Sequence, residues 1–160
     1  MRVLSQDPGP DLIVYTDGAA RGNPGPAGIG VHVTDRRGRT VATLAEGIGV
    51  ATNNQAEYRA VLEALRLAGA RGARSVLVRS DSRLLVEQLE GRFRVKNPTL
   101  QRLHREARGL IRGFERVDLE HVPREQNREA DALANEGVDD WLEARGGGGA
   151  EEPPPTLFGD

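Results

Sequence analysis

Four acidic residues of this chain stand where a strand is predicted to end or a helix to begin, with mostly small or polar residues around them. Asp17 follows the apolar run 12–16, and Asp81 follows the similar run 76–80. Each run is typical of a buried strand, and the Gly-rich stretch 18–30 predicts a long turn after the first one. Both carboxylates are therefore expected at the ends of strands.

The other two acidic residues are expected on helices. Glu57 follows the polar cluster 52–55, which opens a helix, and Asp131 lies in the first turns of a helix that Asn127 is predicted to cap. Taken singly, such acids are more commonly turn, cap or solvated helix residues. Together, four carboxylates without Cys or Lys partners favour a site for the hard cations Mg²⁺ or Mn²⁺ and metal-assisted phosphoryl transfer.

Composition narrows the class of protein. The chain has 160 residues and no cysteine, which excludes disulfides, zinc–thiolate sites and thiol nucleophiles. This length predicts one domain: a flexible N-terminus over 1–10, a folded part over 11–142 and a disordered, Gly/Pro-rich acidic tail over 143–160. Because no stretch reaches the roughly 18 apolar residues of a membrane span, we expect a cytoplasmic protein that does not contact membranes. The expected elements show no evident exposed apolar patch, so we expect a monomer.

Charge is unevenly distributed along the chain. The formal net charge is −2, but residues 136–160 carry −6 and residues 1–135 carry +4. The segment 92–116 holds eight basic residues against two acidic ones. Such a segment is either a surface for a phosphate backbone or a solvated helix face, and charge alone leaves both interpretations open.

Apolar runs and turn signals predict an α/β fold with a mixed five-stranded sheet flanked by helices. Strands are expected over 11–16, 28–34, 40–50, 75–80 and 116–122, and helices over 53–68, 82–89, 99–112 and 128–142. With the two middle helices counted as one layer, the order is βββαβαβα, which implies an antiparallel meander followed by parallel crossovers. The last helix is expected to bury Ala130, Leu133, Ala134, Val138 and Trp141 or Leu142.

Four separated sequence blocks carry a family resemblance. They are TDGAARGNPGPAG from Thr16, TNNQAEYRAVLEAL from Thr52, RSDS around Asp81 and HVPREQNREADALAN from His121. In this order, and with these elements between them, they resemble ribonuclease H of type 1 over about residues 11–142. The resemblance implies a ribonuclease H-like fold.

The resemblance also implies an activity, the endonucleolytic cleavage of the RNA strand of RNA/DNA hybrids to leave a 3′-hydroxyl and a 5′-phosphate. In that family four carboxylates bind two Mg²⁺ ions, for which Mn²⁺ can substitute. The matching positions here are Asp17, Glu57, Asp81 and Asp131. One ion activates the attacking water and the other stabilises the departing oxygen. The hybrid is the implied partner.

Substrate contacts follow from the same resemblance. Asn23 is similar to a residue that reads the RNA 2′-hydroxyl, and Thr52, Asn53 and Asn54 are similar to minor-groove and DNA-phosphate contacts. The alternative roles are turn formation for Asn23 and helix capping for the other three residues. Because such contacts read shape and sugar, little sequence specificity is expected.

The chain departs from the family pattern between its two middle helices. Well-studied bacterial members carry a Lys-rich helical protrusion there, and this chain has only residues 91–98 in its place. The protrusion is therefore expected to be absent. Affinity for the hybrid is then either weaker or dependent on Arg92, Arg94 and Lys96.

A second departure concerns the family's mobile histidine, which assists product release or proton transfer. His121 has the matching spacing from the last acidic residue, but here it is expected on a strand. Compact members have an arginine in a VPRE-like segment that serves instead, and Arg124 matches it. We retain both as candidates, with a purely structural histidine as the alternative for His121.

Other functions compete with the hybrid nuclease. A nuclease for double-stranded RNA or DNA fits the same fold, although Asn23 and Asn54 favour the hybrid. A binding module without catalysis is the rival from a different class, and the presence of all four acids disfavours it. The pair Leu157-Phe158 weakly resembles peptides that dock bacterial sliding clamps, which suggests either a contact with a replication protein or a simple disordered end.

Overall fold

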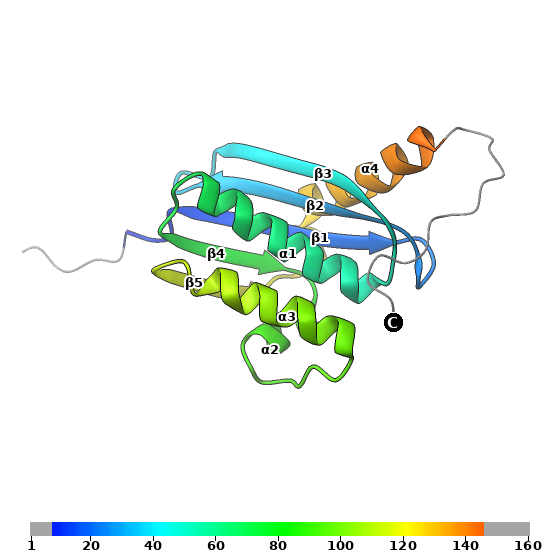
Figure 1. Cartoon of the computed structure of the whole chain (residues 1–160). Coiled ribbons are helices and arrows are strands. Elements are labelled where there is room, and N and C mark those ends of the chain that lie inside the picture. Colours follow the sequence, from blue (N-terminus) through cyan, green and yellow to red (C-terminus); the bar gives the residue numbers. More distant parts are fainter. Residues whose placement is uncertain (1–7, 146–160) are drawn as a thin grey trace, which may run out of the picture.

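Five strands form a single sheet in the computed structural model, which describes residues 8–145 (Figure 1). The strands are β1 (Leu12–Ala20), β2 (Gly25–Asp35), β3 (Thr40–Ala51), β4 (Ser75–Ser80) and β5 (Arg116–His121). The helices are α1 (Asn53–Ala70), α2 (Arg83–Leu89), α3 (Pro98–Ile111) and α4 (Arg128–Ala144), with a 3₁₀ turn, η1 (Arg124–Gln126), before α4. The expected fold class and order of elements are confirmed.

Several expectations fall outside the described part of the chain. Residues 1–7, most of the predicted tail and the Leu157-Phe158 pair are among them. The last helix reaches Ala144 and so extends past the predicted start of the tail at residue 143. Within residues 8–145, no helix is both long and apolar enough to cross a membrane.

The topology of the sheet brings two strand ends together. The strand order is β3-β2-β1-β4-β5, with β1 antiparallel to β2 and parallel to β4. In the parallel pair, Thr16 lies opposite Ser80. Asp17 and Asp81, the next residue in each segment, are therefore neighbours in space although 64 positions apart in sequence.

The predicted long turn over residues 18–30 is wrong. β1 continues through Asp17 to Ala20 and β2 already begins at Gly25, so the turn comprises only residues 21–24. Asp17 consequently lies inside a strand and not at its end. Except for Gly22, the glycines and alanines that suggested a turn are strand residues, and Gly18, Gly28 and Gly30 lie directly against helices.

Close packing explains two of these glycines. A Cβ on Gly18 would lie 2.3 Å from the backbone carbon of Ala56 in α1, and a Cβ on Gly30 would lie 2.1 Å from the backbone oxygen of Ala130 in α4. Real Cβ atoms do not approach backbone so closely, so only glycine fits at either position. The helices that carry Glu57 and Asp131 thus lie almost directly on the sheet.

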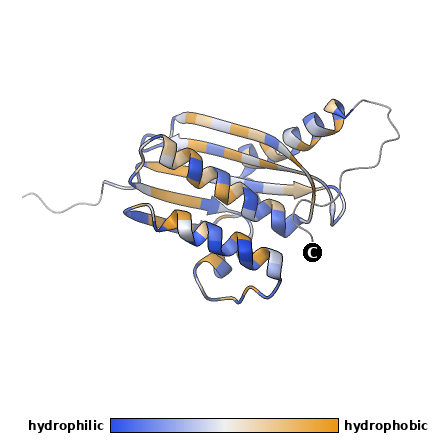
Figure 2. Ribbon diagram, in the orientation of Figure 1, coloured by the Kyte–Doolittle hydropathy of each residue, from blue (hydrophilic) through white to orange (hydrophobic). Residues whose placement is uncertain are grey.

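The hydrophobic core lies between the sheet and the pair α1 and α3, whereas α4 packs on β1, β2 and β3. Figure 2 shows hydrophobic residues concentrated on the strands, and alternating with hydrophilic residues along α1 and α3. On α4 the buried residues are Ala130, Ala134, Gly137 and Val138. Leu133, which was also expected in the core, and Trp141 are only half-buried, and Leu142 is exposed, so the alternative that placed Leu142 in the core is wrong.

Candidate active site

The candidate site forms where β1 extends past its neighbour β4. Their pairing ends at Thr16 and Ser80, while β1 continues to Ala20. Three side chains bond the backbone groups of β1 along this overhang: Asn127 Nδ2 donates to the Thr16 carbonyl (2.9 Å), and Glu57 Oε1 and Asn53 Oδ1 accept the amides of Gly18 (2.5 Å) and Ala20 (3.0 Å). The overhanging edge of β1 is thus occupied by side chains from α1 and the start of α4 instead of by another strand.

The N-terminus of α1 is fixed in register with this edge. Thr52 accepts the amide of Gln55 (3.1 Å), and the Gln55 side chain accepts the amide of Thr52 (2.9 Å), which forms a reciprocal capping box. The Asn53 amide donates to Asn23 Oδ1 in the β1–β2 turn (2.9 Å). One helical turn further along, Glu57 reaches the strand.

Three carboxylates converge at the overhang. Asp17, Glu57 and Asp81 each offer an oxygen atom, and these atoms all lie within 4.8 Å of one another. Asp131 lies within hydrogen-bonding reach of Asp17. All four border a cavity of about 330 Å³ whose other lining residues are Gly18, Ala19, Ala20, Asn53, Asn54 and Arg124.

Burial and mutual repulsion perturb two of these acids. Burial, together with the charges of Glu57 and Asp81, raises the pKa of Asp17 to about 9, and only 6% of Asp17 is exposed. Burial also raises the pKa of Glu57 to about 8, although its hydrogen bond from the Gly18 amide and the charge of Arg124 lower it. The cluster thus holds protons at neutral pH unless another cation neutralises it.

The donor set suits a hard divalent cation. Every ligand candidate in the cavity is a carboxylate or amide oxygen, and no histidine borders it. A cation placed among the carboxylates would offset the repulsion that otherwise drives their protonation. The residues present therefore fit the Mg²⁺ site expected from the sequence.

Of the two candidates for the auxiliary role, Arg124 borders the cavity and His121 does not. His121 is the last residue of β5, as expected, and is exposed.

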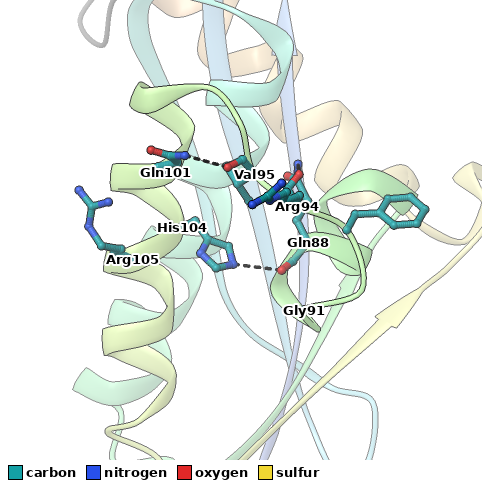
Figure 3. A pocket seen from close by; sticks show the side chains of 8 residues that line it. Gln88, Gly91, Arg94, Val95, Gln101, His104 and Arg105 are labelled. Carbon is teal, nitrogen blue, oxygen red and sulfur yellow. Dashed lines mark hydrogen bonds between the residues drawn. The ribbon is translucent and has the colours of Figure 1, made fainter.

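A second cavity, of about 280 Å³, lies beside the α2–α3 connection (Figure 3). His104 Nε2 bonds the Gln88 carbonyl oxygen (3.0 Å), and the Gln101 side chain donates to the Val95 carbonyl (2.9 Å). Arg94 and Arg105 also line this space. The connection is therefore anchored on both helices and presents basic side chains.

The three basic residues predicted to contact the hybrid differ in whether their charge is already paired with a neighbouring acid. Arg92 is engaged by Glu87 (2.5 and 3.1 Å) and Glu90 (3.4 Å) on its own side of the connection. Arg94 and Lys96 are exposed. Charge on this segment is thus more available at Arg94 and Lys96 than at Arg92.

The sequence did not reveal the roles of two residues of the site. Gly18 admits α1 to the strand and donates to Glu57, and its signal was the run of small residues directly after Asp17. Asn127 stands at the N-cap of α4, as expected, but its side chain makes no cap bond and donates to the Thr16 carbonyl instead. Its pairing with a residue 111 positions away left no local signal.

Known proteins resemble this chain over most of its described length. The family described as reverse transcriptase-like matches residues 15–137. A ribonuclease HI from Halobacterium salinarum is 45% identical over 138 residues, covering 86% of this chain and 69% of that protein. A crystal structure of RNase H1 from the same archaeon superimposes with a TM-score of 0.79 at 46% identity, covering 81% of this chain and 98% of that one.

Two further relatives extend the comparison. LC11-RNase H1, solved in complex with an RNA/DNA hybrid, has a TM-score of 0.79 at 43% identity and covers 82% of this chain and 99% of its own. A bifunctional protein of Mycobacterium tuberculosis is 44% identical over 129 residues. That match covers 80% of this chain but only 35% of the mycobacterial protein.

Proposed function

Because this chain belongs to the ribonuclease H type 1 family, we propose that it cleaves the RNA strand of RNA/DNA hybrids, using two divalent cations held by its four converging carboxylates. The observation that carries the proposal is the cavity at the β1 overhang, where Asp17, Glu57, Asp81 and Asp131 meet. The complex of LC11-RNase H1 with a hybrid supports the choice of substrate.

We propose Mg²⁺ as the working ion, with Mn²⁺ as a substitute. Bound among the four carboxylates, the two ions would supply Lewis acidity for activating the attacking water and for stabilising the departing 3′ oxygen. The products would then carry 3′-hydroxyl and 5′-phosphate ends. The protein's part is to keep the four acids together in spite of their repulsion, and the hydrogen bond from the Gly18 amide to Glu57 does so at one of them.

The hybrid is proposed to run across the β1–β2 turn and the start of α1. Asn53 and Asn54 border the acidic cavity, and Asn23 joins the turn to α1 through the Asn53 amide. Amide side chains at this place suit contacts to a 2′-hydroxyl and to minor-groove edges, which carry little sequence information. Thr52 supports the segment through its capping box.

Arg124 is the proposed auxiliary residue, since it borders the cavity and its charge acts on Glu57. A permanently charged guanidinium there would attract a phosphate, or the charged product of the reaction. Exchanging Arg124 should therefore reduce turnover more than exchanging His121.

The test is the cleavage of an end-labelled RNA/DNA hybrid in Mg²⁺, beside double-stranded RNA, double-stranded DNA and single-stranded RNA. We expect the wild type to cut only the hybrid, and Asp17→Asn to lose the activity by at least about 100-fold while remaining folded. Cutting of double-stranded RNA or DNA instead would assign a different nuclease. Tight binding of the hybrid without cleavage in Mg²⁺ or Mn²⁺ would indicate a binding module.

A further inference from the structure

Asn127 occupies an unusual position for an asparagine. It stands directly before α4, where asparagine commonly caps the helix, yet its side chain makes no cap bond. The residue is fully buried. Its Nδ2 instead donates to the carbonyl of Thr16 across the molecule (2.9 Å).

That carbonyl belongs to the peptide group linking Thr16 to Asp17. Thr16 is the last residue of β1 that pairs with β4, so Asn127 takes a place at the edge where the neighbouring strand ends. The acceptor also fixes the orientation of the amide, because turning it over would set Oδ1 against another carbonyl oxygen.

The backbone of Asn127 holds two other parts of the site. Its amide donates to the Arg124 carbonyl (2.9 Å), which closes the turn that carries Arg124. Its carbonyl accepts the amide of Asp131 (3.0 Å), which begins α4. One buried residue is thus bonded to Arg124, to Asp131 and to the peptide group of Asp17.

Stability alone does not account for this arrangement. Among the described residues, Oδ1 of Asn127 is buried without a hydrogen-bond partner. A half-satisfied buried amide is unfavourable, and such a group in a native structure calls for an explanation other than packing. The three connections of Asn127 to the site supply such an explanation.

We propose that Asn127 is a positioning residue for the nuclease site, which fixes Arg124 and Asp131 relative to Asp17; the inference rests on the proposed function. Asn127 itself does not border the cavity. Its effect is exerted through the Thr16 carbonyl and through its own backbone, so loss of its side chain allows the α4 segment to shift against β1.

The first test compares Asn127→Ala and Asn127→Asp with the wild type in steady-state cleavage of the hybrid. Asp keeps the shape but replaces the NH₂ donor by an oxygen. We expect both variants to lower kcat by about 10-fold to 100-fold with KM for the hybrid changed less than about threefold, as is usual for residues that orient catalytic ligands. Wild-type kcat in Asn127→Asp would overturn the proposal.

A matched control separates positioning from loss of stability. Leu103 is buried in α3, which carries no residue of the site, so Leu103→Ala should lower the urea midpoint while kcat stays within about twofold at a temperature where it is folded. If kcat in Leu103→Ala fell as far as in Asn127→Ala at equal folded fraction, the effect of Asn127 would be structural and the proposal would fail.

A measurement without substrate tests the positioning role of Asn127 separately from the nuclease activity. In ¹⁵N-labelled wild type, the side-chain NH₂ of Asn127 should exchange slowly with solvent, and Asn127→Ala should shift the amide resonances of Asp17 and Asp131 while those of α3 stay in place. Cleavage by the wild type tests the nuclease. Rapid exchange of the NH₂, or unchanged resonances, would reject Asn127 as a positioning residue even if the nuclease is confirmed.

Discussion

In the folded protein the surroundings of Asp17 and Glu57 favour the protonated carboxylic acid over the charged carboxylate. Burial is the main cause, and neighbouring negative charge adds to it, so the pKa of both groups lies far above its ordinary value. A group kept protonated cannot serve as an anionic ligand. In the proposed function cations replace these protons, and without cations the bound protons make the stability of the fold depend on pH.

Without divalent cations, the free energy of unfolding should decrease as pH rises from about 4 to about 9. The folded state holds protons on Asp17 and Glu57 more tightly than the unfolded chain does, since the folded pKa values of about 9 and 8 exceed the ordinary values near 4. This stabilising contribution is complete below pH 4 and is lost as pH rises through the folded pKa values. Urea unfolding in a chelator at several pH values measures it.

Variants and metal provide the controls for the pH prediction. Asp17→Asn and Glu57→Gln should flatten the decrease and stabilise the metal-free protein at pH 8 by about 1–2 kcal/mol, because an amide is neutral in the buried site without having to take up a proton on folding. Mg²⁺ at about 100 times its Kd should stabilise the wild type by about 2.7 kcal/mol. An equally steep decrease in Asp17→Asn would show that the acids of the cavity are not its source.

Among the elements, β1 and α1 depend on each other at the overhang. α1 approaches β1 so closely at Gly18 that Glu57 accepts the strand's amide, and Asn53 accepts the next free one at Ala20. Side chains of the helix thereby satisfy backbone amides of the strand, which fixes the position of Glu57 in the cavity. The close contact between α1 and β1 requires that residue 18 has no Cβ.

Gly18→Ala should therefore damage both fold and activity. Its Cβ would lie 2.3 Å from the backbone of Ala56, so α1 has to move away and Glu57 with it. We expect a loss of about 1–3 kcal/mol in stability, typical of overpacking, and at least a tenfold loss in kcat. Thermal unfolding and hybrid cleavage measure the two effects.

The same substitution at Gly109 is the control. Gly109 is exposed in α3, and a Cβ there would meet nothing closer than the Arg112 side chain at 3.9 Å. Gly109→Ala should raise stability by about 0.5–1 kcal/mol through helix propensity and leave kcat unchanged. If Gly18→Ala behaved like Gly109→Ala, the close approach of α1 would not be required.

At the scale of the whole molecule, charge is separated along the chain. Residues 1–135 carry +4 against −2 for the full chain, and the α2–α3 connection adds exposed basic groups beside its own cavity. Figure 1 shows this connection at the same end of the molecule as the start of α1. We therefore propose that a hybrid bound at the carboxylates extends toward Arg94 and Lys96.

Arg94→Ala should weaken hybrid binding without affecting the chemical step. Loss of one phosphate contact should raise KM by about threefold to tenfold at low salt, lower the salt dependence of binding by about one unit of slope and leave kcat unchanged. Arg37→Ala removes an equal charge from the exposed β2–β3 turn and should change KM less than twofold. Equal effects of both variants would mean that only net charge matters.

Much of this protein could be predicted from local patterns. The order of elements, the five strands and the acidic positions depend on hydrophobic periodicity and on motifs that lie within short stretches, and these follow from residue type. The predicted strand boundaries were wrong where small residues are compatible with either a turn or a strand. Gly18 and Gly25 resemble turn residues in sequence, and the pairing of Gly18 with Ile29 and of Gly25 with Ala51 shows that they belong to strands.

Residue types alone indicate the reactive groups of this protein, which are four acids, flanking amides and a basic segment, because residue type sets charge and ligand hardness. Which of these groups lie together depends on how the strands and helices pack. The register of β1 and β4 brings Asp17 to Asp81, and the turn before α4 directs Arg124 into the cavity and leaves His121 outside it. The side chain of Asn127, which was expected to cap α4, instead donates to the Thr16 carbonyl. Such long-range hydrogen bonds depend on how elements pack and leave no local pattern in the sequence.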